Sequence, residues 1–285
     1  MSILPNPKKI KALALDLDGT LLGPGPVLSE RTIRAVKGCR ERGIKIIIAT
    51  GRAILSAERF CLPLEAEGPT IYFNGALVAD MPKAEILKIT LLDKKAAEIC
   101  LGLSREMGVY YHVFLPGNNL NPRITLVADR DTPDRDAYFK HTGIMAELAD
   151  LEKVLRQKQL KGLVKSMFLA EPEILEEIRL RLNKLLGNSV YAVKSSRTFL
   201  EIMNKNVSKG RALQFVMKRL SLKKEEVIAF GDEENDLPMF STAGFSAAPS
   251  NAKDAVKRAA GLVIGSNADD GVAAFLEEFI LSSSP

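Results

Sequence analysis

The stretch LALDLDGTLL, residues 13–22, decides the fold class. Its first part is an apolar run that predicts a short buried strand, and its second part is rich in the aspartate, glycine and threonine that loops favour. Two similar runs follow, IKIIIAT at 44–50 and TIYF at 70–73, and helical patterns lie between the three. This β-α-β-α-β order predicts a parallel sheet with helices on both faces.

The last third of the chain repeats the same alternation. The expected strands are VIAF (227–230), GFSA (244–247) and LVI (262–264), with helices starting near Asn235, Asn251 and Asp270. In the first third, Ser29 is the expected N-cap of the first helix, with Ile33 and Val36 on its apolar face. The fold class is therefore α/β, a doubly wound parallel sheet of the Rossmann type.

The middle of the chain has a different pattern and indicates an inserted α+β domain. Its expected elements are a ribbon at 76–90, a helix at 93–107, strands at 109–115, 123–128, 166–170 and 189–194, a helix after 170, and a loop at 128–136. We expect the insert to cover residues 83–194, with the α/β core formed by residues 1–82 and 195–285.

Composition and charge narrow the function class. The 285 residues are 46% hydrophobic and 26% charged, which is typical of a folded globular chain. The formal net charge is +5, but the basic residues are scattered and lack the stripe that nucleic-acid binding requires. There is no apolar run of about 20 residues for a membrane span. We expect a cytoplasmic protein with reduced cysteines, no nucleic-acid partner, no membrane contact and no obligate protein partner.

Polar residues gather where the predicted strands end, which is where parallel α/β sheets bind ligands. They are Asp16, Asp18, Gly19 and Thr20; Thr50, Gly51 and Arg52; Asn74 and Gly75; and Gly231, Asp232, Asn235 and Asp236, with Lys209 opening another helix. Grouped carboxylates stay ionised only when a cation joins them, and oxygen ligands suit Mg²⁺. A lysine with Thr50 at a helix start suits a phosphate. Metal and phosphate together predict phosphoryl chemistry.

The pair Asp16 and Asp18 is separated by one residue, so in extended chain both side chains would share a face. One carboxylate could then attack phosphorus while the other moves protons. Either carboxylate alone would also fit an acidic loop or a surface ion pair.

Four segments resemble the signature motifs of the haloacid dehalogenase superfamily of phosphatases: ALDLDGTLL, ATGR, VSKGRAL and GDEENDLPMF, in this order. The position of the insert, with FNGALVAD just before it, resembles the Cof-type group, which carries an α+β cap of the C2B type. The resemblance spans nearly the whole chain, although the cap matches only in size and pattern.

The resemblance implies a role for each matching residue. Asp16 would be the nucleophile and a Mg²⁺ ligand, and Asp18 the acid and base whose carbonyl also binds the metal. Asp232 would be a metal ligand, and Asp236 one directly or through water. Phosphate would be held by Thr50, Gly51, Lys209 and Asn235, whereas Arg52, Asn74 and Gly75 would face the leaving group or the cap.

Some residues fit the resemblance less closely. In SAAPSNAKDAVKRAA (246–260), Pro249-Ser250 replaces the Met-Gly of many relatives, and Asn251 is most simply a helix N-cap, with a supporting contact to the site as the alternative. The insert residues His112, His141, Arg123 and Lys165 would line the cap if they touch substrate, but each is more simply a structural or solvated residue.

The leading hypothesis is a Mg²⁺-dependent phosphomonoester hydrolase that forms an aspartyl-phosphate and acts on sugar phosphates or other small phosphorylated metabolites. A phosphomutase of the same fold is the enzymatic alternative. A phospholigand-binding protein without turnover is the non-enzymatic one, although no catalytic position of the motifs is missing.

Overall fold

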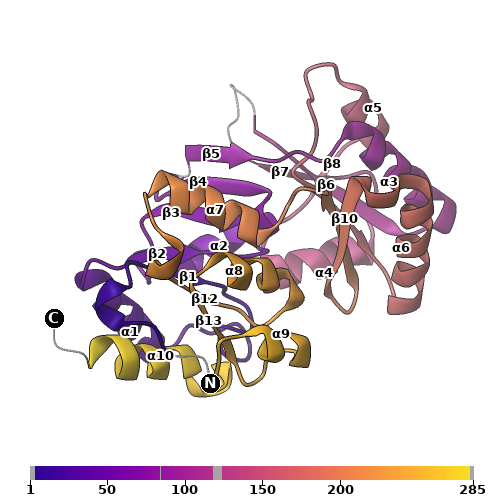
Figure 1. The fold of residues 1–285 in the computed structure, drawn as a ribbon. Helices are drawn as coiled ribbons and strands as arrows, with labels where there is room; N and C mark the ends of the chain where they lie inside the picture. The colour runs from indigo at the N-terminus through magenta and orange to yellow at the C-terminus, as the bar shows by residue number, and fades with distance from the viewer. Residues whose placement is uncertain (1–3, 84, 118–123, 283–285) are drawn as a thin grey trace. The chain divides into compact units, whose positions relative to one another are not determined.

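The computed structural model describes residues 4–83, 85–117 and 124–282, and the chain divides into two compact units (Figure 1). The first unit runs to Lys88 and resumes at Ser208; the second is Ile89–Val207. The expected boundaries after residues 82 and 194 therefore lie 6 and 13 residues earlier than the observed ones (88 − 82 and 207 − 194). Within the described residues, the helices are too short or too polar to cross a lipid bilayer.

The core of the first unit is a parallel sheet with the strand order β14-β13-β12-β1-β2. Its strands are β1 (Ala12–Leu15), β2 (Lys45–Ile48), β12 (Val227–Phe230), β13 (Phe245–Pro249) and β14 (Leu262–Ile264). β1 pairs in parallel with both β2 and β12, with Leu15 opposite Ile48 and Phe230. The chain runs outward from β1 in both directions, so the point where the strand order reverses lies beside β1, and ligands bind at such a point.

Helices cover both faces of this sheet, which confirms the doubly wound class. On one face lie α1 (Glu30–Glu41), α10 (Gly271–Phe275) and the π-helix η7 (Leu276–Leu281), with the rings of Phe230 and Phe275 5.7 Å apart. On the other face, α7 (Lys209–Arg219), α8 (Leu237–Thr242) and α9 (Asp254–Ala259) bury Leu213, Met239 and Val256 against alternate strand residues. Short helices complete the unit: α2 (Ile54–Cys61), η1 (Pro7–Lys9), η2 (Phe73–Gly75), η4 (Lys224–Glu226), η5 (Glu234–Asp236) and η6 (Asn267–Asp269).

The third predicted strand departs from the expected arrangement. β3 (Gly68–Tyr72) meets β2 through one parallel bridge, between Ala49 and Ile71, and then starts an antiparallel sheet of order β3-β4-β5. The other two strands are β4 (Leu77–Met81) and β5 (Glu85–Ile89), the ribbon expected at 76–90. The Phe73–Gly75 turn between β3 and β4 is thereby fixed at the end of a strand that neighbours β2.

The second unit is a sheet of order β10-β11-β9-β6-β7-β8 with an apolar core. Its strands are β6 (Tyr110–Leu115), β7 (Thr125–Ala128), β8 (Glu147–Leu148), β9 (Lys165–Leu169), β10 (Val190–Ser196) and β11 (Phe199–Asn204), and its helices are α3 (Lys94–Met107), α4 (Pro133–Thr142), α5 (Leu151–Arg156), α6 (Pro172–Leu186) and η3 (Gly187–Ser189). The α3 and α6 stripes bury Cys100, Leu175 and Leu182 against it.

Two expectations for this unit are wrong. Residues 133–136 belong to α4 and not to a loop, because Pro133 and the acidic Asp134 and Asp136 occupy a first helical turn, where both residue types are favoured. Residues 195–204 belong to the second unit's sheet, because β11 pairs with both β10 and β9. Arg123, which would line the cap if it touched substrate, lies outside the described residues.

Candidate active site

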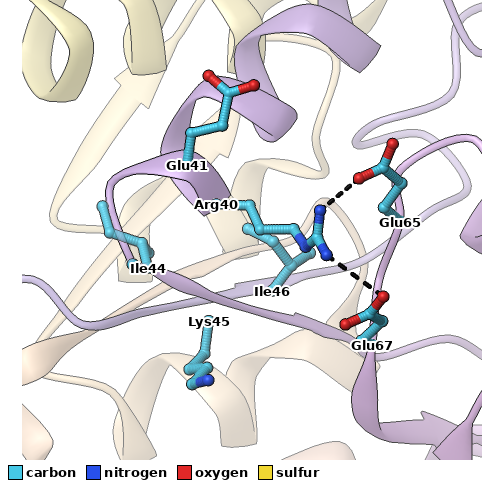
Figure 2. Close-up of a pocket in the computed structure, with 8 residues that line it drawn as sticks. Arg40, Glu41, Ile44, Lys45, Ile46, Glu65 and Glu67 are labelled. Atoms are coloured by element: carbon cyan, nitrogen blue, oxygen red, sulfur yellow. Dashed lines mark hydrogen bonds and ion pairs between the residues drawn. The ribbon is translucent and has the colours of Figure 1, made fainter.

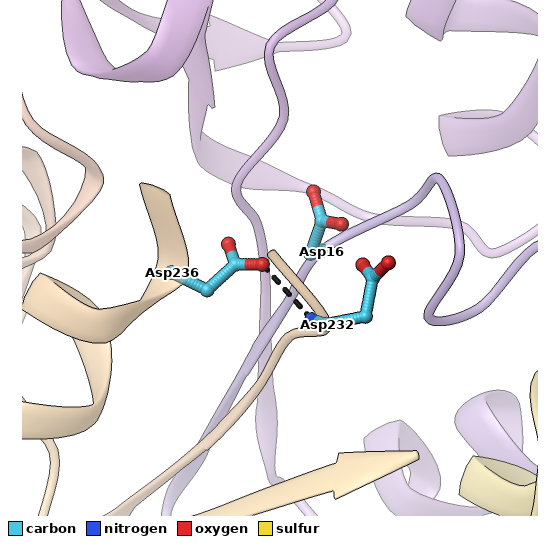
Figure 3. Close-up of side chains that lie close together, drawn as sticks. All are labelled: Asp16, Asp232 and Asp236. Carbon is cyan, nitrogen blue, oxygen red and sulfur yellow. Dashed lines mark hydrogen bonds between the residues drawn. The ribbon is translucent and has the colours of Figure 1, made fainter. Parts of the chain in front are cut away.

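Three carboxylates from two distant parts of the chain meet at the carboxyl end of the parallel sheet. Asp16 directly follows β1, Asp232 follows the neighbouring strand β12, and Asp236 closes the short helix η5. One oxygen from each lies within 4.8 Å of the others, and all three residues are buried. Figure 3 shows the three side chains converging on one point, with Asp236 bonded to the backbone amide of Asp232.

Lys209 opens α7 and points its ammonium group into this cluster. Nζ donates to Asp16 Oδ1 and to Asp236 Oδ1, both at 2.6 Å. The lysine is itself buried, only 2% exposed. Burial alone would lower the pKa of Lys209, but the carboxylates of Asp16 and Asp236 outweigh it and raise the pKa above its usual value, so the side chain stays charged.

The charges of the cluster do not balance. Burial raises the pKa of Asp16 well above its usual value against the pull of Lys209, and burial with the nearby Asp236 raises that of Asp232 to about 6. Lys209 is bonded to Asp16 and Asp236, so ionisation of all three carboxylates would leave a net charge of −3 + 1 = −2, and the raised pKa values show that this charge is unfavourable without a further cation. Buried charge of this kind calls for a counter-ion, and an all-oxygen site suits Mg²⁺. The residues present therefore fit a divalent cation.

The hydrogen bonds show which oxygens remain for a cation. Asp236 uses both: Oδ1 accepts from Lys209, and Oδ2 accepts the backbone amides of Asp232 and Glu233 at 3.0 and 3.1 Å. Asp16 Oδ2 and Asp232 Oδ1 instead share the Thr20 hydroxyl, at 3.4 and 3.0 Å. Asp236 is thus fixed by protein donors, whereas Asp16 and Asp232 present oxygens toward each other.

Thr20 received no role from the sequence, although it belongs to the DLDGT segment. Its hydroxyl is buried between the carboxylates of Asp16 and of Asp232, which lies 212 residues further along the chain. The preceding Gly19 adopts a φ of +74°, and an added Cβ there would lie 2.2 Å from Asp232 Oδ2. Glycine is therefore required both by the backbone conformation and by the close approach of Asp232.

Asp18 lies outside the carboxylate cluster. Both of its oxygens accept from Arg52, from Nε at 2.7 Å and from Nη2 at 2.6 Å, and its side chain is 53% exposed. The guanidinium of Arg52 also lies 4.9 Å from the centre of the Phe60 ring. The structure thus pairs Asp18 with Arg52, which by the resemblance would face the leaving group or the cap.

The residues expected to bind phosphate form a connected row beside the cluster. Thr50 is fully buried, and its hydroxyl accepts the backbone amide of Arg52 at 3.1 Å. An added Cβ on Gly51 would lie 3.0 Å from Asn74 Oδ1, which accepts from Asn235 Nδ2 at 2.9 Å.

Asn235 also carries a buried Oδ1 without a hydrogen-bond partner in the described chain. Gly75 packs on the backbone that leads into Lys209, since an added Cβ would lie 2.4 Å from Ser208 O.

Asn251 is not a helix N-cap, because α9 starts at Asp254 and is capped by Lys253. Its amide instead bonds to Gly19 O at 2.8 Å and to the backbone amide of Asn267 at 2.9 Å, which is the supporting contact that the sequence left as the alternative. In the second unit, His112 is buried among aromatic rings, Lys165 forms a buried ion pair with Glu201 at 2.9 Å, and His141 is exposed.

A surface hollow at the opposite end of β2 offers no comparable chemistry. Figure 2 shows Arg40 reaching toward two carboxylates there, and it pairs with both Glu65 and Glu67. The hollow is lined by Arg40, Glu41, Ile44, Lys45, Glu65 and Glu67. Arg40 is already paired with carboxylates, and Glu41, Glu65 and Glu67 outnumber Arg40 and Lys45 in the lining, so the hollow is not a candidate anion site.

Comparisons with known proteins agree with this geometry. The family model of haloacid dehalogenase-like hydrolases matches residues 13–276. The chain is 30% identical to the HMP-PP phosphatase of Cronobacter sakazakii, over 81% of this chain and 80% of that one. It is 27% identical to the 5-amino-6-(5-phospho-D-ribitylamino)uracil phosphatase YwtE of Bacillus subtilis, over 95% and 98%.

Among solved structures, the fold is similar to TM0651 from Thermotoga maritima, with a TM-score of 0.82, 30% identity and coverage of 97% and 98%. The site lies on the four segments that resemble the superfamily's motifs, and the predicted resemblance is confirmed. The chain belongs to the haloacid dehalogenase-like hydrolase family, and it is a phosphatase.

Proposed function

We propose that this phosphatase is a Mg²⁺-dependent phosphomonoester hydrolase that forms an aspartyl-phosphate on Asp16 and acts on sugar phosphates or similar metabolites. The observation that carries the proposal is the charge of the buried cluster: among the described residues, Lys209 is the cation bonded to Asp16 and Asp236, and ionisation of these two and Asp232 would leave a deficit of two positive charges. The buried free cysteines Cys39, Cys61 and Cys100 fit the reducing cytoplasm, where we place the enzyme.

The reaction divides into two displacements at phosphorus. A carboxylate oxygen of Asp16 attacks the phosphorus, the bond to the leaving oxygen breaks, and Asp18 gives that oxygen a proton. Asp18, now ionised, takes a proton from water, the water oxygen attacks phosphorus, and the bond to Asp16 breaks to release inorganic phosphate. Each step balances, and Asp16 and Asp18 return to their starting states.

The surrounding residues position and neutralise the phosphoryl group, which is most of what phosphoryl transfer requires. Lys209 holds Asp16 through Oδ1 and supplies a positive charge beside the attacked phosphorus. Thr50, Gly51 and Asn235 would bind phosphoryl oxygens. Mg²⁺, held by Asp16, Asp232, the carbonyl of Asp18 and Asp236 directly or through water, would supply charge neutralisation.

The exposed position of Asp18 suits a group that must reach both a leaving oxygen and a water. In this structure Asp18 is held by Arg52, so proton transfer requires the carboxylate to leave or shift along the guanidinium. Arg52, Asn74 and Gly75 would then face the leaving group.

Hydrolysis of p-nitrophenyl phosphate tests the proposal. We expect wild-type protein and an Asp136→Asn control to release nitrophenol with Mg²⁺ and to stop when the metal is chelated. Asp16→Asn should be inactive under both conditions. Equal rates for wild type and Asp16→Asn, or rates that do not depend on Mg²⁺, would contradict it.

A panel of phosphorylated metabolites then separates hydrolysis from a mutase reaction. A hydrolase releases inorganic phosphate from a sugar monophosphate alone. A phosphomutase would instead need a sugar bisphosphate as activator and would return the phosphoryl group to a second hydroxyl. Isomerised sugar phosphate without released phosphate would therefore favour the mutase.

A further inference from the structure

Asn251 lies in the turn after β13, at an exposed position, and both ends of its amide are engaged. Nδ2 donates to the carbonyl oxygen of Gly19 at 2.8 Å, and Oδ1 accepts the backbone amide of Asn267 at 2.9 Å. Gly19 follows β1 and Asn267 follows β14, and two strands separate β1 from β14 in the sheet. One side chain thus ties together two loops that the sheet itself does not join.

Asn267 extends this connection to the far end of the same loop. Its Nδ2 donates to the carbonyl oxygen of Leu22 at 2.7 Å. The loop from Gly19 to Leu22 is therefore held at both ends by asparagine side chains, and we call Asn251 and Asn267 the amide clamp. Inside the loop, the backbone amides of Thr20 and Leu22 donate to Leu17 O at 3.3 and 2.8 Å, which makes the loop one compact turn.

The clamped loop is the part of the chain that touches the carboxylates. The backbone of Gly19 lies so close to Asp232 that an added Cβ would meet Oδ2 at 2.2 Å. Thr20 Oγ1 lies 3.0 Å from Asp232 Oδ1 and 3.4 Å from Asp16 Oδ2. A shift of this loop would therefore move the contacts that set the orientation of both carboxylates.

We propose that Asn251 is a positioning residue for the metal site. By holding Gly19, and Leu22 through Asn267, it keeps Gly19 and Thr20 against Asp232 and so fixes the spacing of the Asp16 and Asp232 oxygens. This inference rests on the proposed function, since it concerns the site that would hold Mg²⁺. Contacts one step outside a metal site typically change metal affinity or activity about 10–100-fold when they are removed.

Variants at two positions separate the hydrogen bonds at the two ends of the Asn251 amide, whose Oδ1 also accepts from Ser266 Oγ at 3.4 Å. Asn251→Ala removes all of them, and Asn251→Asp keeps the acceptor for the Asn267 amide but loses the donor to Gly19. Asn267→Ala removes the bond to Leu22. Ser250→Ala, an exposed neighbour in the same turn, is the matched control. Because Asn251 is exposed, water can replace its bonds in the folded protein, and we expect the variants to fold.

The experiment measures Mg²⁺ binding by calorimetry together with kcat and KM for p-nitrophenyl phosphate. We expect Asn251→Ala and Asn251→Asp to weaken Mg²⁺ binding by about 10–100-fold and Asn267→Ala to weaken it less. The KM for substrate should change less than the Mg²⁺ dissociation constant, and saturating Mg²⁺ should restore much of the lost kcat. If Asn251 served only stability, its variants would have a lower melting temperature, and the Mg²⁺ affinity of the folded protein would be unchanged.

The outcomes distinguish this inference from the function on which it rests. If Asn251→Ala and Asn251→Asp bind Mg²⁺ as tightly as Ser250→Ala, the positioning role is wrong and the hydrolase stands. If wild type and Ser250→Ala neither bind Mg²⁺ nor hydrolyse substrate, the proposed function is wrong. Should the Asn251 variants fail to fold, Asn267→Ala decides, and unchanged Mg²⁺ binding by that variant would overturn the proposal.

Discussion

Asp16 and Asp18 are two residues apart and have opposite surroundings. Asp16 is buried and fixed by Lys209, whereas Asp18 is half exposed and lies along the guanidinium of Arg52. The expected shared face does not extend to Asp18, because β1 ends at Leu15 and the residues after Asp16 form a turn. A fixed carboxylate suits a nucleophile, and a half-exposed one suits proton transfer.

Replacing Asp18 by Asn should slow turnover sharply while leaving the fold intact. General acid–base catalysis by a positioned side chain contributes about 10²–10⁴-fold, so we expect kcat to fall by that factor. The loss is chemical and not structural, because the Asp18 side chain is 53% exposed, and the melting temperature should match that of wild type. Steady-state kinetics with a sugar phosphate measures the effect. An Asp18→Asn variant with wild-type kcat would remove Asp18 from the mechanism.

At this scale, residue type and position after a strand were enough to predict the cluster of Asp16, Asp232, Asp236 and Lys209. They were not enough for Thr20 or Asn251. The roles of these two depend on hydrogen bonds to chain segments more than 200 residues away, and a single sequence carries no signal for such partners. The side chain of Asn251 fits a cap as well as a cross-link, and only the end of β13 and the start of α9 decide between them.

At the scale of elements, the start of α1 is tied to the start of α10. Ser29 Oγ accepts the backbone amide of Thr32 at 3.0 Å, which confirms the predicted N-cap. The same hydroxyl donates to Asp270 Oδ1 at 2.6 Å, and Asp270 is the residue before α10. One hydroxyl therefore serves two helices that lie side by side under the sheet (Figure 1).

Ser29→Ala should destabilise the first unit through this cap. Loss of an N-cap serine costs about 0.5–2 kcal/mol, and here Asp270 also loses a donor, so we expect about 1–2 kcal/mol. Urea unfolding followed by circular dichroism measures the change, with Ser250→Ala as the control. The Mg²⁺ dependence of the activity should not change. A stability equal to that of the control would show that the cap contributes little.

The strands of the parallel sheet were predictable because short, continuous apolar runs have few alternatives to a buried strand, and β1 and β12 are indeed buried along their whole length. Prediction failed for two segments whose composition or position along the chain suggested a different assignment from the one in the structure. The Pro133 segment has the composition of a loop but starts α4, and β11 was missed because Phe199–Asn204 adjoins the lysine motif of the core. Because β11 belongs to the second unit, that unit ends at Val207 and not at residue 194 as expected.

At the scale of the whole molecule, the second unit buries a titratable ring. His112 on β6 is fully buried, and its ring nitrogens have no hydrogen-bond partner in the described chain. It packs against Tyr110, Phe114 and Tyr138, with ring centroids 4.5–5.5 Å apart. Burial, and secondly the charge of Lys165, lower the pKa of His112 well below its usual value.

This ring should make the protein less stable in mild acid. Below about pH 6.5 the unfolded chain binds a proton at His112 that the folded protein does not, so stability is lost as the pH falls, by up to about 1.4 kcal/mol per pH unit. We expect His112→Phe to lose less stability than wild type between pH 7 and pH 5, whereas His141→Gln, at an exposed position, behaves as wild type. Urea unfolding at both pH values tests this, and equal losses in wild type and His112→Phe would contradict it.

The central claim is that the phosphoryl group passes to Asp16 at a site built by two distant parts of the chain. Asp18→Asn offers a direct measurement, because p-nitrophenolate leaves without a proton but the second displacement still needs a base. We predict that this variant, mixed with p-nitrophenyl phosphate and Mg²⁺ and quenched in acid, yields a peptide containing Asp16 that carries one added phosphoryl group by mass spectrometry. Asp16→Asn should yield none. Turnover by wild type with no phosphorylated Asp16 peptide in the quenched Asp18→Asn variant would contradict the account.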